Sequence, residues 1–226
     1  SSDLQYVFSL MARVLTPGAI KLKIQLLNNA GAVIGSATIN DVTTEWKKIT
    51  ASIAVTDTAQ RGKLNIVFEG EGIIDIDMIS LFPKDTWKGR AGGLRNDIVQ
   101  KIADLKPGFL RFPGGCIVEG KDLTNRYQWK TTVGNTDDRT LIMNRWNVEF
   151  RHRAAPDYYQ SFGLGFYEYF QLAEDMGATP LPILSCGMAC QFNSAEVAAM
   201  DELQPYIDDA LDLIEFANGG VTTHWG

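Results

Sequence analysis

The feature that most constrains the fold of this chain is a change in hydrophobic periodicity near Pro83. Before it, apolar and polar residues alternate with period two, which is typical of half-buried strands. In AIKLKIQLLNNAG, the residues that point one way are Ile20, Leu22, Ile24 and Leu26. WKKITASIAV continues the alternation, and KLNIVFEGEGIIDIDMISLF gives two more strands divided by Gly70 and Gly72. Residues 1–82 therefore predict a β-sandwich of the jelly-roll kind.

After Pro83, helical patterns alternate with short apolar strands. Helices are predicted in AGGLRNDIVQKIADLKPG, in LGFYEYFQLAEDMGA with Gly177 as its C-cap, and in DELQPYIDDALDLIEFANGG. Buried strands are predicted at 109–112 and in TPLPILSC. Strands without polar alternation, each followed by a helix, indicate an α/β fold with a parallel sheet. The pattern alone leaves an open sheet and part of a barrel undecided for residues 83–226.

Each predicted helix has an apolar stripe on one face, and the stripe of the third helix is expected to face inward. The stripes are Leu94, Ile98, Ile102 and Leu105 on the first helix; Phe166, Tyr169, Phe170, Ala173 and Met176 on the second; and Tyr206, Ile207, Ala210, Leu211 and Ile214 on the third.

Composition excludes several classes of partner. Hydrophobic residues make up 45% of the chain and charged residues 21%, as in globular proteins, and the net charge is −6. A nucleic-acid or anionic-membrane partner is therefore not expected. No apolar run reaches the roughly 18 residues that a membrane span needs. No signal peptide is visible, and the start SSDLQYVFSL, without methionine, indicates an internal or processed beginning.

The cysteines and histidines give no metal or cofactor signature. Three cysteines do not form a disulfide framework, and the spacing of Cys186 and Cys190 is not that of a zinc knuckle. The two histidines are His152 and His224. We therefore expect no metal site and no cofactor, and we interpret Cys186 and Cys190 as small buried hydrophobic residues. Dinucleotide, phosphate-loop and nucleophile-elbow motifs are also missing from the sequence.

Two predicted strand ends could present side chains to a ligand: FLRFPGGCIVEG at residues 109–120 and ILSCGMACQFN. In parallel α/β folds, ligands bind at the carboxyl ends of strands. Gly114 and Gly115 allow positive φ and a close approach of the backbone to a ligand. The side chains of Cys116 and Glu119 would then lie near the carboxyl end of the strand, where a ligand would bind. A structural Gly-Gly turn with a solvated glutamate is the alternative, and the pattern alone does not separate the two.

The segment NRYQWKTTVGNTDDRTLIMNRWN carries three aromatic residues, Tyr127, Trp129 and Trp146. Aromatic faces beside polar groups are a common means of holding a sugar ring. The alternative, slightly favoured by pattern alone, is that Trp129 and Trp146 anchor the loop. Glycoside hydrolysis needs two carboxylates about 5–10 Å apart. The acidic candidates, most of them expected to be solvated, are Glu119, Asp137, Asp138, Glu149, Glu168 and Glu174.

Taken in order, LKPGFLRFPGGCIVEG, NRYQWKTTVGN, DDR, Trp146 and GLGFYEYFQLAEDMGATPLPILSCGM resemble the α-L-arabinofuranosidases of glycoside hydrolase family 51. The resemblance is greatest to the type found in gut Bacteroidetes and runs from about Phe82 to Gly226. Residues 1–82 resemble, more weakly, the carbohydrate-binding-module-like sandwich that this type inserts after its first barrel strand. The resemblance implies that residues 83–226 are the second and third units of a TIM (β/α)8 barrel.

For function, the resemblance implies a retaining, exo-acting glycosidase whose catalytic residues are not in this chain. The family's acid/base glutamate follows an asparagine on the fourth barrel strand, its nucleophile lies later, and a further sugar-binding glutamate lies on the first strand. The fragment alone is therefore expected to be inactive. The resemblance assigns Cys116 and Trp146 to substrate binding, with Gly115 at the strand end and Glu119 as a supporting group.

The matching segments also depart from the family pattern. The family often has Gly-Pro at Gly134–Asn135 and Arg-Pro at Arg139–Thr140, which leaves the conformation of the loop before Trp146 less defined. Arg111 and Gly114 match the pattern and would shape the strand end.

The implied substrate is an arabinose-containing plant polysaccharide or oligosaccharide, and the family suggests a periplasmic or secreted enzyme. A partial barrel leaves strand edges and apolar faces open. We therefore expect either the remainder of the same polypeptide or a homo-oligomer to cover them. Two alternatives stay open: another barrel glycosidase, or a carbohydrate-binding module with an inactive scaffold. Aromatic residues on the sandwich that could serve such a module are Tyr6, Trp46 and Phe68.

Overall fold

The computed structural model describes residues 4–16, 18, 20–40, 42–148 and 157–226. Glu149 and His152, named above, lie outside the described residues. The chain forms two compact units, Ser1–Asp104 and Leu105–Gly226. The predicted division between residues 82 and 83 falls at the end of the last strand of the first unit, and this domain assignment stays a prediction.

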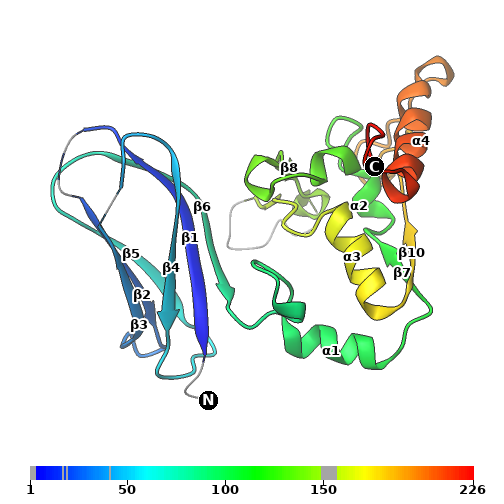
Figure 1. Ribbon diagram of the computed structural model, residues 1–226. Coiled ribbons are helices and arrows are strands. Elements are labelled where there is room, and N and C mark those ends of the chain that lie inside the picture. The colour runs from blue at the N-terminus through cyan, green and yellow to red at the C-terminus, as the bar shows by residue number, and fades with distance from the viewer. Residues whose placement is uncertain (1–3, 17, 19, 41, 149–156) are drawn as a thin grey trace. The chain divides into compact units, whose positions relative to one another are not determined.

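In the part that is described, the first unit contains two three-stranded antiparallel sheets (Figure 1). One sheet has the order β4–β1–β6, formed by β1 (Gln5–Val14), β4 (Lys47–Ala54) and β6 (Ile74–Pro83). The other has the order β3–β2–β5, formed by β2 (Lys21–Leu27), β3 (Val33–Ile39) and β5 (Lys63–Glu69). The predicted strands are present, and the arrangement is compatible with the predicted β-sandwich.

The two sheets share one apolar core. Phe8 and Leu10 of β1 and Leu22 and Ile24 of β2 are all fully buried in it. The period-two alternation predicted for β2 is therefore confirmed. On the edge strand β5, by contrast, Phe68 is 50% exposed.

The sandwich brings its first and last strands together. Tyr6 of β1 pairs with Pro83 of β6, and the two strands run antiparallel beside each other. Just beyond β6, the backbone N–H of Lys84 donates to the carbonyl of Gln5 at 2.8 Å. The segment that begins the sandwich and the segment that leaves it are therefore neighbours.

After the sandwich come η1 (Trp87–Gly89) and helix α1 (Asn96–Asp104). The helix forms where the apolar period predicted it, but its apolar stripe is not buried. Ile98 and Ile102 are 47% and 41% exposed, whereas Val99 is 5% exposed. The described residues do not cover this apolar face of α1.

The second unit is built on a parallel strand pair, β7 (Phe109–Phe112) and β10 (Thr179–Pro182). Phe109 pairs with Thr179 and Phe112 with Pro182, and the N–H of Ile183 donates to the carbonyl of Phe112 at 2.7 Å. Helix α3 (Phe166–Met176) packs against both strands. The predicted strands and their parallel pairing are confirmed, whereas the described residues do not by themselves form a barrel.

An aromatic core fills this unit. Phe112 stacks on Tyr169 with ring centroids 4.8 Å apart, and Phe166 is fully buried beside them. Trp129 is 1% exposed, and its indole Nε1 donates to the carbonyl of Asp209 at 2.9 Å. Helix α3 ends at Gly177, whose φ of 66° is the left-handed conformation that the sequence predicted for its C-cap.

Short elements connect β7 to α3: α2 (Cys116–Glu119), η2 (Trp129–Thr132), η3 (Thr136–Asp138), β8 (Ile142–Met143), η4 (Arg145–Val148) and β9 (Tyr159–Gln160). Strands β8 and β9 pair antiparallel. After β10 come η5 (Met200–Glu202) and helix α4 (Gln204–Asn218).

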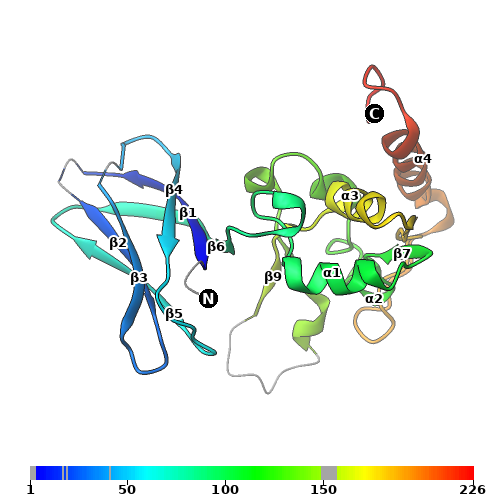
Figure 2. The same cartoon turned by 60° about the horizontal axis from the view of Figure 1, so that its bottom comes forward.

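Helix α4 lies at the margin of the second unit (Figure 2). Leu213 is buried, but Ile207, Leu211 and Ile214 are 50%, 58% and 62% exposed. The prediction that this stripe faces inward is therefore wrong for the described residues. Among the helices that the structure describes, none combines the length and the apolar character that a membrane crossing requires.

Candidate functional site

The carboxyl ends of β7 and β10 lie at one edge, because the two strands are parallel and in register. β7 leads through Pro113 and Gly114 into α2, and β10 leads into the segment that ends at Cys190. Gly114 has a φ of 141°, in the region that favours glycine. Gly115 has a φ of −85°, so it does not use the positive φ that glycine allows.

The backbone at Gly115 is open to a ligand on the side where a side chain would project. A Cβ added there would meet Arg111 Nη2 at 3.8 Å, which is ordinary van der Waals contact. Glycine at this position therefore leaves space that the described residues do not fill.

Helix α2 places Cys116 and Glu119 on one face, because residues three apart in a helix are neighbours. Cys190 completes a cluster with them. One ligand atom from each of the three side chains lies within 4.8 Å of the other two. Cys190 is fully buried, whereas Cys116 and Glu119 are half-buried. Glu119 Oε2 is buried and has no hydrogen-bond partner among the described residues.

Backbone hydrogen bonds hold the Cys190 loop against the end of α2. The N–H of Cys190 donates to the carbonyl of Gly120 at 3.3 Å, and the N–H of Ser194 donates to the carbonyl of Lys121 at 3.1 Å. Gly120 has a φ of 73°, and a Cβ there would lie 2.5 Å from the carbonyl oxygen of Asn125. A residue with a side chain would clash here with the backbone of Asn125 and Arg126, so the close approach of this segment to α2 requires glycine.

Arg145 connects this cluster to Trp146. Its Nη2 donates to Cys190 Sγ at 3.0 Å, and its guanidinium carbon lies 4.0 Å from the ring centroid of Trp146. The second contact is a cation–π interaction, and Arg145 is 2% exposed. The structure therefore places the predicted site residues Cys116 and Glu119 in one cluster and links Trp146 to that cluster through Arg145 and Cys190, and Gly115 directly precedes Cys116 in the chain.

The environment of Cys190 favours a protonated thiol. Burial raises the pKa of Cys190, because the thiolate would lose its hydration, and the neighbouring Arg145 lowers that pKa by a smaller amount. The net direction is upward, so this thiol is neutral near pH 7 unless another positive charge reaches it.

Cys190 and Arg145 were not predicted as site residues. Cys190 was expected to be buried, and this is confirmed, whereas the same expectation for Cys186 is wrong. Cys186 lies in irregular backbone after β10, where its side chain is exposed. The available signal for Cys190 was its position shortly after a predicted parallel strand.

Two of the three aromatic candidates belong to the core rather than to a ligand site. Tyr127 is 6% exposed and packs edge-on against Phe162 with ring centroids 5.0 Å apart. Trp129 packs against Phe216 and Trp225, with ring centroids 5.2 and 5.0 Å from theirs. The alternative that Trp129 anchors the loop is therefore confirmed.

Glu168 of α3 has a structural partner. Its carboxylate accepts hydrogen bonds from the guanidinium of Arg139 at 2.8 and 3.0 Å and from the N–H of Gly165 at 2.8 Å. Arg139 is buried, and its Nη2 also donates to the carbonyl of Gly134. Glu168 therefore stabilises the start of α3, and Glu174 on the same helix is exposed.

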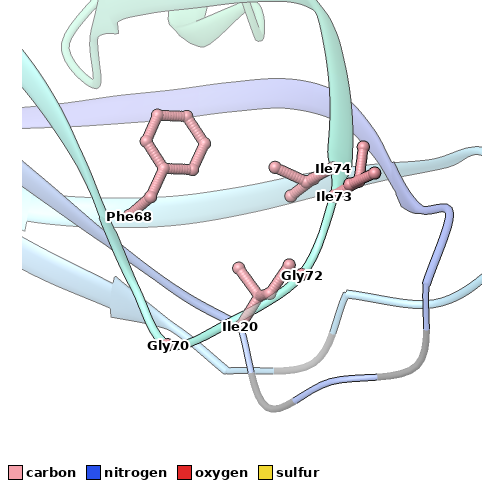
Figure 3. A pocket seen from close by; sticks show the side chains of 6 residues that line it. All are labelled: Ile20, Phe68, Gly70, Gly72, Ile73 and Ile74. Atoms are coloured by element: carbon pink, nitrogen blue, oxygen red, sulfur yellow. The ribbon is translucent and has the colours of Figure 1, made fainter.

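The sandwich carries a separate pocket of about 310 Å³ (Figure 3). Its lining residues are Ile20, Phe68, Gly70, Gly72, Ile73 and Ile74. None of these six has a polar side chain, whereas sugar sites combine an aromatic face with hydrogen-bonding groups. The pocket therefore lacks the chemistry of a carbohydrate site.

A parallel strand pair with glycines, a short helix and polar side chains at its carboxyl edge defines the ligand-binding end of an α/β enzyme domain. The family profile described as Alpha-L-arabinofuranosidase 1 domain matches residues 101–226, which is more than half of the chain. The chain therefore belongs to this family, the α-L-arabinofuranosidases of glycoside hydrolase family 51.

Similar proteins cover nearly the whole chain. It is 40% identical to the extracellular exo-α-L-arabinofuranosidase of Streptomyces chartreusis over 98% of its length, and 36% identical to α-L-arabinofuranosidase 1 of Arabidopsis thaliana over 94%. A solved structure titled as an arabinose-bound GH51 α-L-arabinofuranosidase matches 97% of the chain with a TM-score of 0.82 and 33% identity. The chain spans 26%, 30% and 34% of these three proteins.

Proposed function

We propose that this chain is part of a retaining, exo-acting α-L-arabinofuranosidase that releases terminal α-L-arabinofuranosyl residues from plant polysaccharides or oligosaccharides. The observation that carries the proposal is the similarity to an arabinose-bound enzyme over 97% of the chain. The cluster at the carboxyl edge of β7 and β10 supports it, because ligands of parallel α/β folds bind at this edge.

In the proposed sugar subsite, Cys116 and the open backbone of Gly115 approach the furanose, and Trp146 forms a wall. Arg145 supports that wall, since its guanidinium lies against the Trp146 ring and is fixed by Cys190. Glu119 is a supporting group on the same face of α2 as Cys116. These residues bind and orient the sugar, and they supply neither catalytic carboxylate.

The chemistry would follow the retaining route. One glutamic acid protonates the leaving oxygen, and a second glutamate forms a covalent arabinosyl intermediate that water then hydrolyses. We assign both glutamates to parts of the protein outside this chain, so the chain alone is inactive.

For the fold, we propose that β7 and β10 are the second and third strands of a (β/α)8 barrel formed by residues 83–226 and the remainder of the polypeptide. The exposed apolar faces of α1 and α4 support this, because large apolar faces are normally covered by a partner. Residues 1–82 would be the carbohydrate-binding-module-like sandwich inserted into this enzyme.

The test is release of 4-nitrophenol from 4-nitrophenyl α-L-arabinofuranoside. The full-length protein is expected to turn over, and the 25.0 kDa chain is expected to be inactive. Trp146→Ala in the full-length protein should lower kcat/KM about tenfold, which corresponds to about 1.4 kcal/mol of lost sugar contact. The matched control is Trp46→Ala, a 42% exposed tryptophan on the sandwich, which should leave this small substrate's turnover unchanged.

Robust turnover by the chain alone, abolished by Glu119→Gln, would contradict the assignment of both glutamates to other parts of the protein. The alternative, a binding module on an inactive scaffold, predicts no turnover by the full-length protein and retarded migration of the sandwich in gels containing arabinan. The apolar lining of the sandwich pocket disfavours that alternative.

A further inference from the structure

We propose that Cys116, Glu119 and Cys190 form a binding site for one soft divalent cation of the zinc class. Two thiols and a carboxyl group supply the ligand atoms, and these lie within 4.8 Å of one another. Zinc is bound in proteins by cysteine sulfur together with nitrogen or carboxylate oxygen, whereas magnesium and calcium prefer oxygen alone. The donor set therefore selects zinc or cadmium over the hard cations.

The geometry requires a small contraction of the three side chains. Zinc–sulfur bonds of about 2.3 Å and zinc–oxygen bonds of about 2.0–2.2 Å in a tetrahedron put neighbouring ligand atoms about 3.5–3.8 Å apart. Side-chain rotation of Cys116 and Glu119 can supply this movement, because both residues are half-buried and project from the same face of α2. The fourth position would hold water or another small ligand.

The charges in the cluster also match a divalent cation. With both thiols deprotonated, the three ligand groups carry three negative charges, and the guanidinium of Arg145, which contacts Cys190, carries one positive charge. A 2+ ion would bring the sum to zero, and buried charges are stable only when they are compensated in this way. The two thiol protons pass to solvent as the metal binds.

A second observation points to a missing ligand at Glu119. Its Oε2 atom is buried and has no hydrogen-bond partner among the described residues. A buried acceptor without a partner destabilises the folded state, so an ion bound to this oxygen would relieve that cost.

Metal binding does not depend on the proposed sugar site, although the two share Cys116 and Glu119. A bound ion would occupy the same edge of β7 and β10, so zinc is expected to compete with arabinose. Zinc binding measured without sugar tests this inference alone, and turnover in metal-free buffer tests the proposed function alone.

The experiment is titration calorimetry of the full-length protein, reduced with a phosphine and stripped of metal with a chelator, using zinc chloride. One site that contains these ligands is expected. Cys116→Ser and Cys190→Ser should each weaken zinc binding at that site by more than about 100-fold, and Glu119→Gln by about tenfold. The matched control is Cys186→Ser, an exposed cysteine outside the cluster, which should bind zinc like the unchanged protein.

A spectroscopic measurement keeps the proposal testable if the serine variants do not fold. Cobalt bound to the unchanged protein should show thiolate-to-metal charge-transfer absorption, and Glu119→Gln, which keeps both thiols, should shift that absorption while the melting temperature stays within a few degrees. Lack of zinc binding by the unchanged protein overturns the proposal. It is also overturned if both serine variants bind zinc normally, or if Cys116 and Cys190 are linked by a disulfide that resists the phosphine.

Discussion

In the sandwich, Leu22 and Ile24 of β2 are fully buried between two sheets, whereas on α4 of the second unit Leu211 and Ile214 stay 58% and 62% exposed. Both segments have a regular apolar pattern in the sequence. The sandwich supplies two sheets that cover each other, but the second unit has no described element over this face of α4. Periodicity therefore identifies the apolar face of an element without telling whether the chain itself covers that face.

The largest effect is expected inside the second unit, where the aromatic core is closed despite the open helix faces. Trp129→Ala should lower the free energy of unfolding by about 3–5 kcal/mol, because it removes a buried ring and its hydrogen bond to Asp209. Trp129→Phe keeps most of the ring and should be milder. Urea denaturation of the full-length protein, monitored by far-ultraviolet circular dichroism, gives the free energy of unfolding of both variants. Small and equal losses of that free energy would show that this core is loosely packed.

A comparable loss is expected in the sandwich. Ile24→Ala should cost about 2–5 kcal/mol, and the conservative Ile24→Val about 0.5–1.5 kcal/mol, because Ile24 is fully buried between the sheets. Limited proteolysis in increasing urea can separate unfolding of the sandwich from that of the second unit. If Ile24→Ala left the free energy of unfolding unchanged, the sandwich would not have a tightly packed core at this position.

The sharpest test of the comparison is Leu211→Ala measured in two contexts. In the 226-residue chain, the substitution should change stability by less than about 0.5 kcal/mol, as for other exposed positions. In the full-length protein it should cost about 2 kcal/mol or more if the remaining barrel covers α4. The same small value in both contexts would mean that this face stays open, and the proposed barrel would lose its main support.

The smallest effect is expected at Phe68, which lies on the edge strand β5 and borders the apolar pocket of the sandwich. Because half of its surface is exposed, Phe68→Ala should cost no more than about 1 kcal/mol. The Phe68→Ala variant should migrate in gels containing arabinan at the same rate as the unchanged protein. Loss of retention with intact stability would instead assign carbohydrate binding to the sandwich.

Much of the secondary structure could be predicted from the sequence because it depends on local signals. The alternation through Ile24 predicts β2, and Gly177 predicts the end of α3, since each depends on neighbours within a few residues. The exposure of Ile98 and Leu211 could not be predicted, because it depends on which segments of the protein lie over those faces.

The candidate site divides in the same way. Gly115, Cys116 and Glu119 belong to one contiguous segment, so the sequence alone could place them together on a strand end. Cys190 joins them through the register of β7 with β10 and through the docking of its loop on Gly120, and Arg145 joins them through its hydrogen bond to Cys190. These are long-range contacts, and no local pattern encodes the pairing of distant segments.

The pairing of Tyr6 with Pro83 at one end of the sandwich has a consequence for how such a protein can be rearranged. A module whose two ends are neighbours can be inserted into a surface loop of another domain without stretching it, and it can be removed with a short linker in its place. The hydrogen bond from Lys84 to Gln5 holds those ends side by side. Insertion or deletion of the whole sandwich would therefore leave the distance between the two flanking segments almost unchanged.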